Sequence, residues 1–363
     1  MTAVHQFVPA LLPRDATGDH TLALRDALRT AGFGSEIFVE AAHDELGHEA
    51  TYFERYPERA RPDDVLVYQM GTASPVAEFL CGRTEALVLD YHNVTPARFY
   101  EGWEAHTAEK VATARAQLAD LAPRAVLGIG DSAFNAAELR RLGCRRTAVV
   151  PIIVETAPWA EVDEDALGEL AAGHGSGTVL LFVGRLSPNK RQHRLVECLW
   201  LYRRWFDPEA RLHLVGPATT PSYARATLSF AEELGLGGAV RRAEHLGAAE
   251  LAAWYADADV FVSLSEHEGF CIPLLEAMRA GVPIVALGAA AVPETLGAAG
   301  LVLDDGRPST VAPAVDRVRR DGELRRRLAD AGWARLGAFD PGRTRARFVS
   351  LLSEVAARPR VPA

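Results

Sequence analysis

The sequence predicts an α/β protein made of two doubly wound domains, each a parallel sheet with helices on both faces. Three observations predict this fold class. Short apolar runs, typical of strands buried on both faces, alternate with helical segments along most of the chain. The alternation occurs twice, and an acidic stretch rich in Gly and Ala at 155–177 lies between the two sets. A length of 363 residues is enough for two domains that each bury a core.

The first set of elements predicts a domain over residues 1–156. We expect helices over 21–31 and 107–121 in this half. The expected strands cover residues 4–8, 36–39, 65–68, 86–90, 126–129 and 148–153.

The second set predicts a domain over residues 157–341. Its expected helices cover 191–205, 223–234, 249–256 and 273–280. A final helix is expected at 342–357, after Pro341. The sequence leaves open which domain it packs on, and packing back on the first domain is one of the two options. The expected strands cover residues 179–183, 211–215, 239–242, 260–264, 283–286 and 301–303.

Composition excludes several classes of protein. The net charge of −9 argues against nucleic acid as a main partner, because phosphate binding needs a basic surface. The four cysteines form no C-x-x-C pair, so we expect neither a zinc site nor a disulfide framework. No apolar run approaches the roughly 20 residues of a membrane span, and the first residues lack the pattern of a signal peptide. We therefore expect a cytoplasmic protein.

Two basic clusters, at 140–146 and 317–327, raise the question of a membrane surface. Each has a helical charge pattern and lies among or near acidic residues, so solvated helix faces explain them better. The sequence leaves membrane association open but does not favour it.

Ligands of doubly wound sheets bind at the carboxyl ends of the strands, and two facing domains of this kind place a cleft between those ends. The stretch 179–194 is the first candidate there. An expected strand runs into Gly184, and a helix is expected to start near Asn189 or Lys190. Arg185 and Lys190 lie on this turn, where a helix N-terminus already favours anions. Two cations there suit a diphosphate, although a solvated surface explains them equally well when they are taken alone.

The stretch 260–278 is the second candidate. Its expected strand runs into a loop, and Pro273 suits the first turn of the following helix. We expect Glu276 in that first turn and Glu268 on the loop, both on the cleft side. Carboxylates rarely lie in such apolar stretches without partners. A helix-dipole role and a loop-capping role explain one acid but not both. The backbone amides expected to offer unpaired donors belong to Gly269, Phe270 and Cys271.

The first domain offers two weaker candidates. His92 and Asn93 follow an expected buried strand, so His92 is a candidate polar contact for a transferred group. A lone histidine is nevertheless more often structural. Gly18 precedes an amphipathic helix and is expected to lie on a strand-to-helix loop, which is a weak signal alone.

Together these stretches resemble the retaining glycosyltransferases of family 4, which have the GT-B fold of two facing Rossmann-like domains. The family's E-x7-E signature matches Glu268 and Glu276. Its GR-x-x-x-x-K element matches Gly184, Arg185 and Lys190. The stretch 283–305 also resembles the family. The resemblance is most specific over 179–305 and weaker in the first half.

The resemblance implies a nucleoside-diphosphate sugar bound on the second domain. Arg185 and Lys190 would then hold the diphosphate, and Glu276 the ribose. Glu268, with the amides of 269–271, would hold the sugar hydroxyls and phosphate. Leu246 would line the base pocket. Gly18 would approach the diphosphate from the first domain, and His92 would contact the sugar or the leaving group.

The chain departs from the family at two places. Cys271 stands where glycine is usual, although its amide remains a donor. Residues 151–154 read Pro-Ile-Ile-Val where many members have Asn-Gly-Val-Asp. The second departure leaves the role of that turn towards an acceptor or between domains in doubt.

Neither carboxylate is assigned as a nucleophile, so the expected reaction is front-side transfer with retention, aided by Arg185 and Lys190. We expect no metal and no cofactor beyond the sugar nucleotide. A uridine diphosphate sugar is favoured, and guanosine diphosphate mannose is the alternative. The acceptor is a small molecule, a glycan or a lipid-linked group. A phosphorylase, a sugar-nucleotide epimerase and a non-catalytic sugar-nucleotide sensor remain as alternatives.

Overall fold

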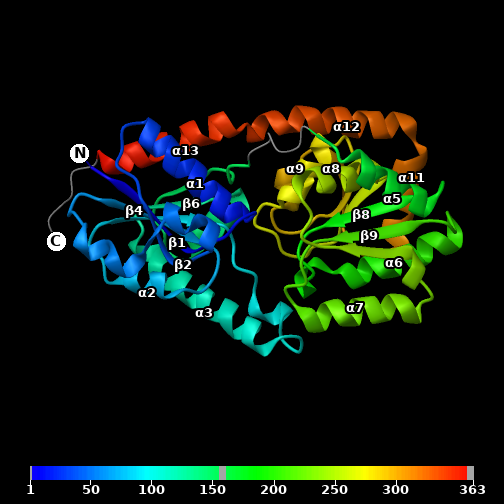
Figure 1. The fold of residues 1–363 in the computed structure, drawn as a ribbon, viewed down its shortest axis with the longest axis horizontal. Coiled ribbons are helices and arrows are strands. Elements are labelled where there is room, and N and C mark those ends of the chain that lie inside the picture. Colours follow the sequence, from blue (N-terminus) through cyan, green and yellow to red (C-terminus); the bar gives the residue numbers. More distant parts are fainter. Residues whose placement is uncertain (1, 155–160, 358–363) are drawn as a thin grey trace. The chain divides into compact units, whose positions relative to one another are not determined.

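A computed structural model describes residues 2–154 and 161–357 (Figure 1). The chain forms two compact units. Unit 1 contains the described parts of Met1–Arg98, His106–Val154 and Phe339–Ala363. Unit 2 contains Phe99–Ala105 and the described part of Glu155–Ala338. The expected boundary at residues 156 and 157 lies outside the described residues. Part of the stretch expected to separate the domains forms helix α5 of unit 2.

Unit 1 is built on a seven-stranded sheet in the order β3-β2-β1-β4-β5-β6-β7, in which every pair is parallel. The strands are β1 Val4–Leu11, β2 Ile37–Ala42, β3 Thr51–Tyr52, β4 Val65–Met70, β5 Ala86–Tyr91, β6 Leu127–Gly130 and β7 Thr147–Val149. The α-helices are α1 Ala16–Thr30, α2 Pro75–Cys81, α3 Ala105–Leu121, α4 Ala133–Arg141 and α13 Pro341–Ala356. Short 3-10 helices are η1 Asp44–Glu49, η2 Phe53–Glu58, η3 Ala97–Phe99 and η4 Ala122–Arg124.

Unit 2 is built on a six-stranded parallel sheet in the order β10-β9-β8-β11-β12-β13. Its strands are β8 Val179–Val183, β9 Arg211–Val215, β10 Val240–Ala243, β11 Val260–Ser263, β12 Ile284–Leu287 and β13 Gly300–Leu303. Its helices are α5 Glu164–His174, α6 Gln192–Trp205, α7 Pro221–Glu233, α8 Ala248–Asp257, α9 Ile272–Arg279, α10 Val292–Leu296, α11 Pro308–Arg320 and α12 Gly322–Leu336. The 3-10 helices are η6 Pro188–Lys190, η7 Gly237–Ala239 and η8 Gly337–Phe339.

Both sheets are buried on both faces, as the continuous apolar runs predict. Successive residues of β8 point to opposite sides: Leu180 and Phe182 join the core formed with α6 and α11, whereas Leu181 joins the core formed with α8 and α9. In unit 1, Leu66 and Val67 of β4 divide in the same way between two cores. Each unit therefore has a three-layer α/β architecture.

The chain returns to unit 1 at its C-terminal end. Helix α13 runs beside α1 (Figure 1), and Phe348 and Leu352 are fully buried in the core that also contains Leu24 of α1. The apolar face of α13 thus completes one side of the unit 1 sheet.

Several expected boundaries were wrong, and three of the differences have a clear physical reason. Strand β7 ends at Val149, because Pro151 has no N–H to continue a ladder. Helix α6 starts at Gln192, after η6 and after Arg191 in a left-handed conformation (φ 58°). Gly18 lies within the first turn of α1, because Asp15 caps that helix by accepting a hydrogen bond from the Gly18 N–H.

The strand order locates the edge where a ligand is expected in each unit. In unit 2 the order reverses between β8 and β11, and in unit 1 between β1 and β4. Ligands of doubly wound sheets bind at the carboxyl ends of strands beside such a reversal. The loops after β8 and β11 contain the residues that the sequence analysis selected in unit 2.

Candidate active site

The loop after β8 begins with a close approach of two backbone segments. A Cβ atom on Gly216, which follows β9 with φ 136°, would lie 2.3 Å from the Gly184 carbonyl oxygen. Only glycine fits at residue 216, and the two strand ends lie side by side as a result. This packing directs the chain from Gly184 into the loop that carries Arg185.

Hydrogen bonds and an ion pair connect the loops after β8 and β11. The Glu266 N–H donates to the Asn189 carbonyl oxygen at 2.9 Å, and the Asn189 side-chain amide donates to the His267 carbonyl oxygen at 3.2 Å. Arg191 and Glu266 form an ion pair beside these bonds. The β8–β11 edge of unit 2 is therefore a connected loop pair.

Lys190 and Glu268 form the second ion pair between these loops. Lys190 Nζ lies 2.5 Å from Glu268 Oε1, and the two side chains are 15% and 9% exposed. The sequence analysis selected both residues but assigned them to different groups of a ligand. A ligand at this edge meets them as a hydrogen-bonded pair, whose partners lie 78 residues apart in the sequence.

Arg185 lies on the same edge and is exposed. Its guanidinium has neither a hydrogen bond nor an ion pair with any residue that the structure describes. An exposed, unpaired cation on the loop that also carries Lys190 is available to an anionic ligand. Leu246, which follows β10, is half-buried against the core beneath α8 and α9.

Helix α9 presents its N-terminus at this edge. Cys271 precedes the helix in a left-handed conformation (φ 74°), which glycine adopts with less strain. Within the described part of the chain, the N–H groups of Gly269 and Cys271 have no backbone acceptor. Phe270 is buried, and its carbonyl oxygen accepts a hydrogen bond from the Thr295 hydroxyl at 2.7 Å. The arrangement holds amide donors at a helix N-terminus, where anions are favoured.

The prediction that Glu276 lies in the first turn of its helix was wrong. Helix α9 begins at Ile272, so Glu276 is one turn further on and takes no part in N-terminal capping. Its carboxylate accepts a hydrogen bond of 2.7 Å from the hydroxyl of Tyr255, a fully buried residue of α8. Burial raises the pKa of Glu276 to about 7, although the Tyr255 hydrogen bond opposes this shift. Sequence reasoning missed Tyr255, because an apolar helical pattern gives no sign of where its hydroxyl points.

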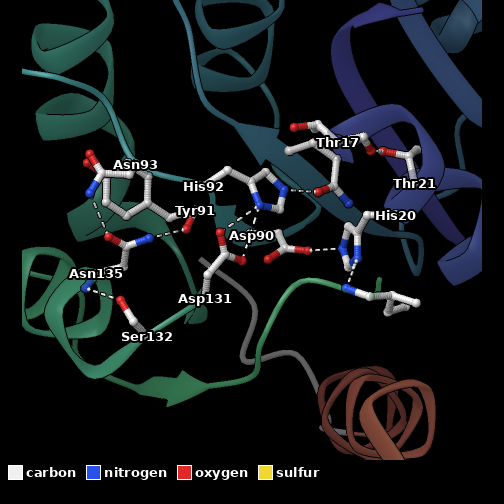
Figure 2. A network of polar contacts seen from close by, with 12 residues as sticks. Thr17, His20, Thr21, Asp90, Tyr91, His92, Asn93, Asp131, Ser132 and Asn135 are labelled. Carbon is white, nitrogen blue, oxygen red and sulfur yellow. Dashed lines mark hydrogen bonds and ion pairs between the residues drawn. The ribbon is translucent and has the colours of Figure 1, made fainter. Parts of the chain in front are cut away.

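The carboxyl edge of the unit 1 sheet carries a buried polar network (Figure 2). His92, which follows β5, lies between two partners. Its Nδ1 is 3.1 Å from a carboxylate oxygen of Asp131, and its Nε2 is 2.6 Å from Gln69 Oε1. Only 6% of the His92 side chain is exposed. Both ring nitrogens are therefore occupied by protein groups.

A second histidine lies beside the first. His20 of α1 contacts the His92 ring with centroids 5.3 Å apart, and its Nε2 is 2.9 Å from Asp90 Oδ2. The N–H of Ile153 donates to His20 Nδ1 at 3.1 Å. Sequence reasoning selected His92 but missed His20, Asp90 and Asp131, because only the tertiary structure brings these buried groups together.

His20, Asp90 and His92 could offer three metal-ligand atoms within 4.8 Å of one another. Their hydrogen bonds do not suit this role. His20 Nδ1 accepts the Ile153 N–H, so a neutral ring carries its proton on Nε2, where a metal would have to bind. The network is better described as hydrogen-bonded pairs.

Gly18 is packed against the loop before α1. A Cβ atom at this position would lie 3.0 Å from the Leu12 carbonyl oxygen, so glycine permits the close approach of α1 to that loop. The Gly18 N–H is already used by the Asp15 cap.

Comparison with known proteins identifies the second half of the chain. The family described as "Glycosyl transferases group 1" matches residues 173–335. A D-inositol 3-phosphate glycosyltransferase of Corynebacterium glutamicum is 30% identical over 192 residues, which are 50% of this chain and 45% of that protein. A GDP-mannose-dependent mannosyltransferase of Mycolicibacterium smegmatis, which acts on a phosphatidylinositol monomannoside, is 33% identical over 56% of this chain and 55% of its own length.

Solved structures confirm the GT-B fold of this chain. Anabaena HepE, in complex with UDP and glucose, superposes with a TM-score of 0.72 at 19% identity and covers 97% of this chain and 100% of its own. Sucrose-phosphate synthase of Thermosynechococcus elongatus superposes with a TM-score of 0.77 at 18% identity. The match covers 98% of this chain and 100% of that protein. The predicted fold class is thus confirmed. The resemblance to a glycosyltransferase family is confirmed over residues 173–335.

The family match contains every candidate residue of unit 2 and excludes Gly18 and His92. This chain spans about half the length of the relatives named above. Within residues 2–154 and 161–357, no helix combines the length and the apolarity that a membrane span requires.

Proposed function

We propose that this chain is a group 1 glycosyltransferase that moves a hexose-type sugar from a nucleoside-diphosphate sugar to an acceptor hydroxyl, with retention of configuration and without a metal. The observation that carries the proposal is the grouping of Arg185, the Lys190–Glu268 pair and Glu276 at the β8–β11 edge of unit 2. This edge is where a doubly wound sheet binds a ligand.

The proposed donor site uses each of these groups for a different part of the sugar nucleotide. Arg185 and Lys190 hold the diphosphate, together with the amides of Gly269, Phe270 and Cys271 at the start of α9. Lys190 contacts Oε1 of Glu268, so the other carboxylate oxygen accepts hydrogen bonds from sugar hydroxyls. Glu276, oriented by Tyr255, accepts the ribose hydroxyls. Leu246 lines the base pocket.

The proposed chemistry needs no protein nucleophile. The acceptor oxygen bonds to the anomeric carbon on the face from which the phosphate oxygen departs. The acceptor hydroxyl proton moves to that departing oxygen. Arg185 and Lys190 stabilise the negative charge that grows on the diphosphate, which is the role that a divalent cation would otherwise fill.

A uridine diphosphate sugar is the favoured donor, supported by the fold shared with HepE, whose structure holds UDP and glucose. GDP-mannose is the alternative, supported by the mannosyltransferase relative. The inositol phosphate relatives make a phosphorylated cyclitol the first acceptor to test. A lipid-linked or glycan acceptor is the next.

A thermal-shift panel with UDP, GDP, ADP, TDP and their sugar conjugates tests the donor site. We expect one base to stabilise the protein selectively, and the stabilisation to disappear in Arg185→Ala/Lys190→Ala. Transfer to added acceptors is then followed with that donor. Turnover of the donor without any acceptor would favour an epimerase. Binding without turnover would favour a sensor, and no shift with any nucleotide at millimolar concentration would reject the proposal.

A further inference from the structure

A series of side-chain hydrogen bonds crosses four adjacent strands of the unit 1 sheet, β1, β4, β5 and β6. The Gln6 amide of β1 donates to the Thr21 carbonyl oxygen at 2.8 Å. The Gln69 amide of β4 donates to Gln6 Oε1 at 3.0 Å. Gln69 Oε1 lies 2.6 Å from His92 Nε2, after β5, and Asp131, after β6, lies at His92 Nδ1. Figure 2 shows the Asp131 carboxylate beside the His92 ring.

The first hydrogen bond of this series, from Gln6 to the Thr21 carbonyl oxygen, sets the direction of the bonds that follow. A backbone carbonyl can only accept, so Gln6 must turn its NH₂ group to Thr21 and its oxygen to Gln69. Gln69 must then turn its NH₂ group to Gln6 and its oxygen to the histidine. An amide oxygen cannot donate, so His92 Nε2 must carry a proton.

The other ring nitrogen faces a carboxylate. His92 Nδ1 lies 3.2 and 3.1 Å from the two oxygens of Asp131, whose side chain is 4% exposed. A ring that donates at both nitrogens is an imidazolium.

The charges around the ring support this protonation state. Burial lowers the pKa of His92. The carboxylates of Asp131, Asp90 and Asp15 raise this pKa by more than burial lowers it, so that it reaches about 9. His20 adds no opposing charge, because its Nδ1 accepts the Ile153 N–H and the ring is neutral. Burial also raises the pKa of Asp131, so this acid is the group that competes with His92 for the proton.

We propose that Gln69, held by Gln6, is a positioning residue that keeps His92 as an imidazolium at the carboxyl edge of the unit 1 sheet. An imidazolium with both N–H groups engaged cannot take a proton from an acceptor hydroxyl. The inference rests on the proposed function in one respect: it removes His92 as a general base and leaves the acceptor proton to the departing phosphate oxygen. His92 then acts through its fixed positive charge and through its hydrogen bonds to Gln69 and Asp131, which link neighbouring strands.

Side-chain ¹⁵N NMR of histidine-labelled protein tests the protonation state without any substrate. The His92 signals are those lost in His92→Gln, or in His92→Asn if the first variant does not fold. We expect protonation at both ring nitrogens of His92 at pH 8, and a midpoint near 9. A neutral His92 ring at pH 8, with the proton on Asp131 or absent, would overturn the proposal.

Variants of Gln69 test the positioning role. Gln69→Leu removes the acceptor at Nε2, so we expect the His92 midpoint to fall by about one unit or more. Gln69→Glu keeps an acceptor and adds charge, so the midpoint should rise. The matched control is Gln117→Leu, which removes another buried glutamine of unit 1. Among the described residues, its hydrogen bonds go to the Ser74 backbone. A shift in the control as large as in Gln69→Leu, or no shift in Gln69→Leu, would contradict the role.

The pH dependence of transfer separates this inference from the proposed function. With His92 as a required cation, activity falls as pH rises through about 9, and Gln69→Leu moves that fall to lower pH. Activity that instead rises through the His92 midpoint would identify the ring as a base and overturn the inference. Absence of transfer with every donor would reject the proposed function, whereas the NMR result would still decide the state of His92.

Discussion

Lys190 Nζ and Glu268 Oε1 lie 2.5 Å apart, and this contact joins the loop after β8 to the loop after β11. The two residues were selected from the sequence as separate contacts of a sugar nucleotide. Their pairing means that neither acts alone: each sets the charge that the other presents to a ligand. A substitution at either residue therefore changes both the proposed site and the stability of unit 2.

Lys190→Ala leaves the Glu268 carboxylate with little exposure and without its cation. We expect a loss of about 2–3 kcal/mol in the free energy of unfolding, measured with denaturant. Lys190→Ala/Glu268→Gln should recover part of this loss but no transfer activity. The control pair Arg194–Glu197 is more exposed, so Arg194→Ala should cost less than about 1 kcal/mol. Equal losses in the free energy of unfolding for Lys190→Ala and Arg194→Ala would show that the buried pair stabilises the protein no more than the exposed pair.

Arg185→Ala removes an exposed cation without a partner among the described residues. Unfolding free energy should change by no more than about 0.5 kcal/mol. Transfer should fall about 100-fold or more in kcat/KM, because charge on the leaving diphosphate loses a partner. Arg326→Ala, an exposed arginine of α12, is the control and should leave both quantities unchanged. Substantial residual turnover in Arg185→Ala would remove this residue from the mechanism.

Glu276 should make donor binding depend on pH. Because burial raises its pKa to about 7, only roughly a tenth of the protein has an ionised Glu276 at pH 6, so donor affinity should be about tenfold weaker at pH 6 than at pH 8. The unfolded chain ionises this group more readily, so its contribution to stability falls as pH rises from about 4.5 to about 7. Calorimetric titration of Glu276→Gln should give an affinity that is weak and independent of pH over this range. The same pH dependence in the variant would exclude Glu276 as its source.

Tyr255→Phe tests the residue that orients Glu276. Loss of the hydroxyl should raise the donor KM several-fold and move the midpoint of the pH dependence upward, because this hydrogen bond opposes the raised pKa. Stability should fall by about 1 kcal/mol. Tyr202→Phe is the control, since that buried hydroxyl lies 3.5 Å from Thr178, at the amino end of β8 and so at the opposite end of the strand from the site loop. An unchanged KM in Tyr255→Phe would limit the tyrosine to packing.

Chelation tests the expected independence from metals. If Arg185 and Lys190 supply the positive charge for the leaving diphosphate, saturating EDTA should leave the initial rate of transfer unchanged. The rate is measured before and after dialysis against the chelator, with added Mg²⁺ and Mn²⁺ as controls. A rate that vanishes with EDTA and returns with a divalent cation would contradict the proposed mechanism.

The fold class could be predicted because burial of a parallel sheet leaves a direct mark on the chain. Strands such as Val179–Val183 and Val260–Ser263 must be apolar on both faces, and the helices between them must be amphipathic. The residues at the ends of β8 and β11 could also be selected, since ligand contacts in this fold follow strand ends. Local conformations were harder: the left-handed Arg191 and the Asp15 cap at Gly18 shifted the expected helix starts by one to several residues.

The sequence by itself determined the elements, their alternation, and which loops carry charged side chains. Only the tertiary structure decided the partners. Lys190 meets Glu268 across 78 residues, Tyr255 meets Glu276 across 21, and His92 meets Asp131 across 39. Periodicity along the chain reports which face of an element is buried. It does not report which polar group a buried side chain meets there, because that depends on the strand order and on how adjacent strand ends pack in three dimensions.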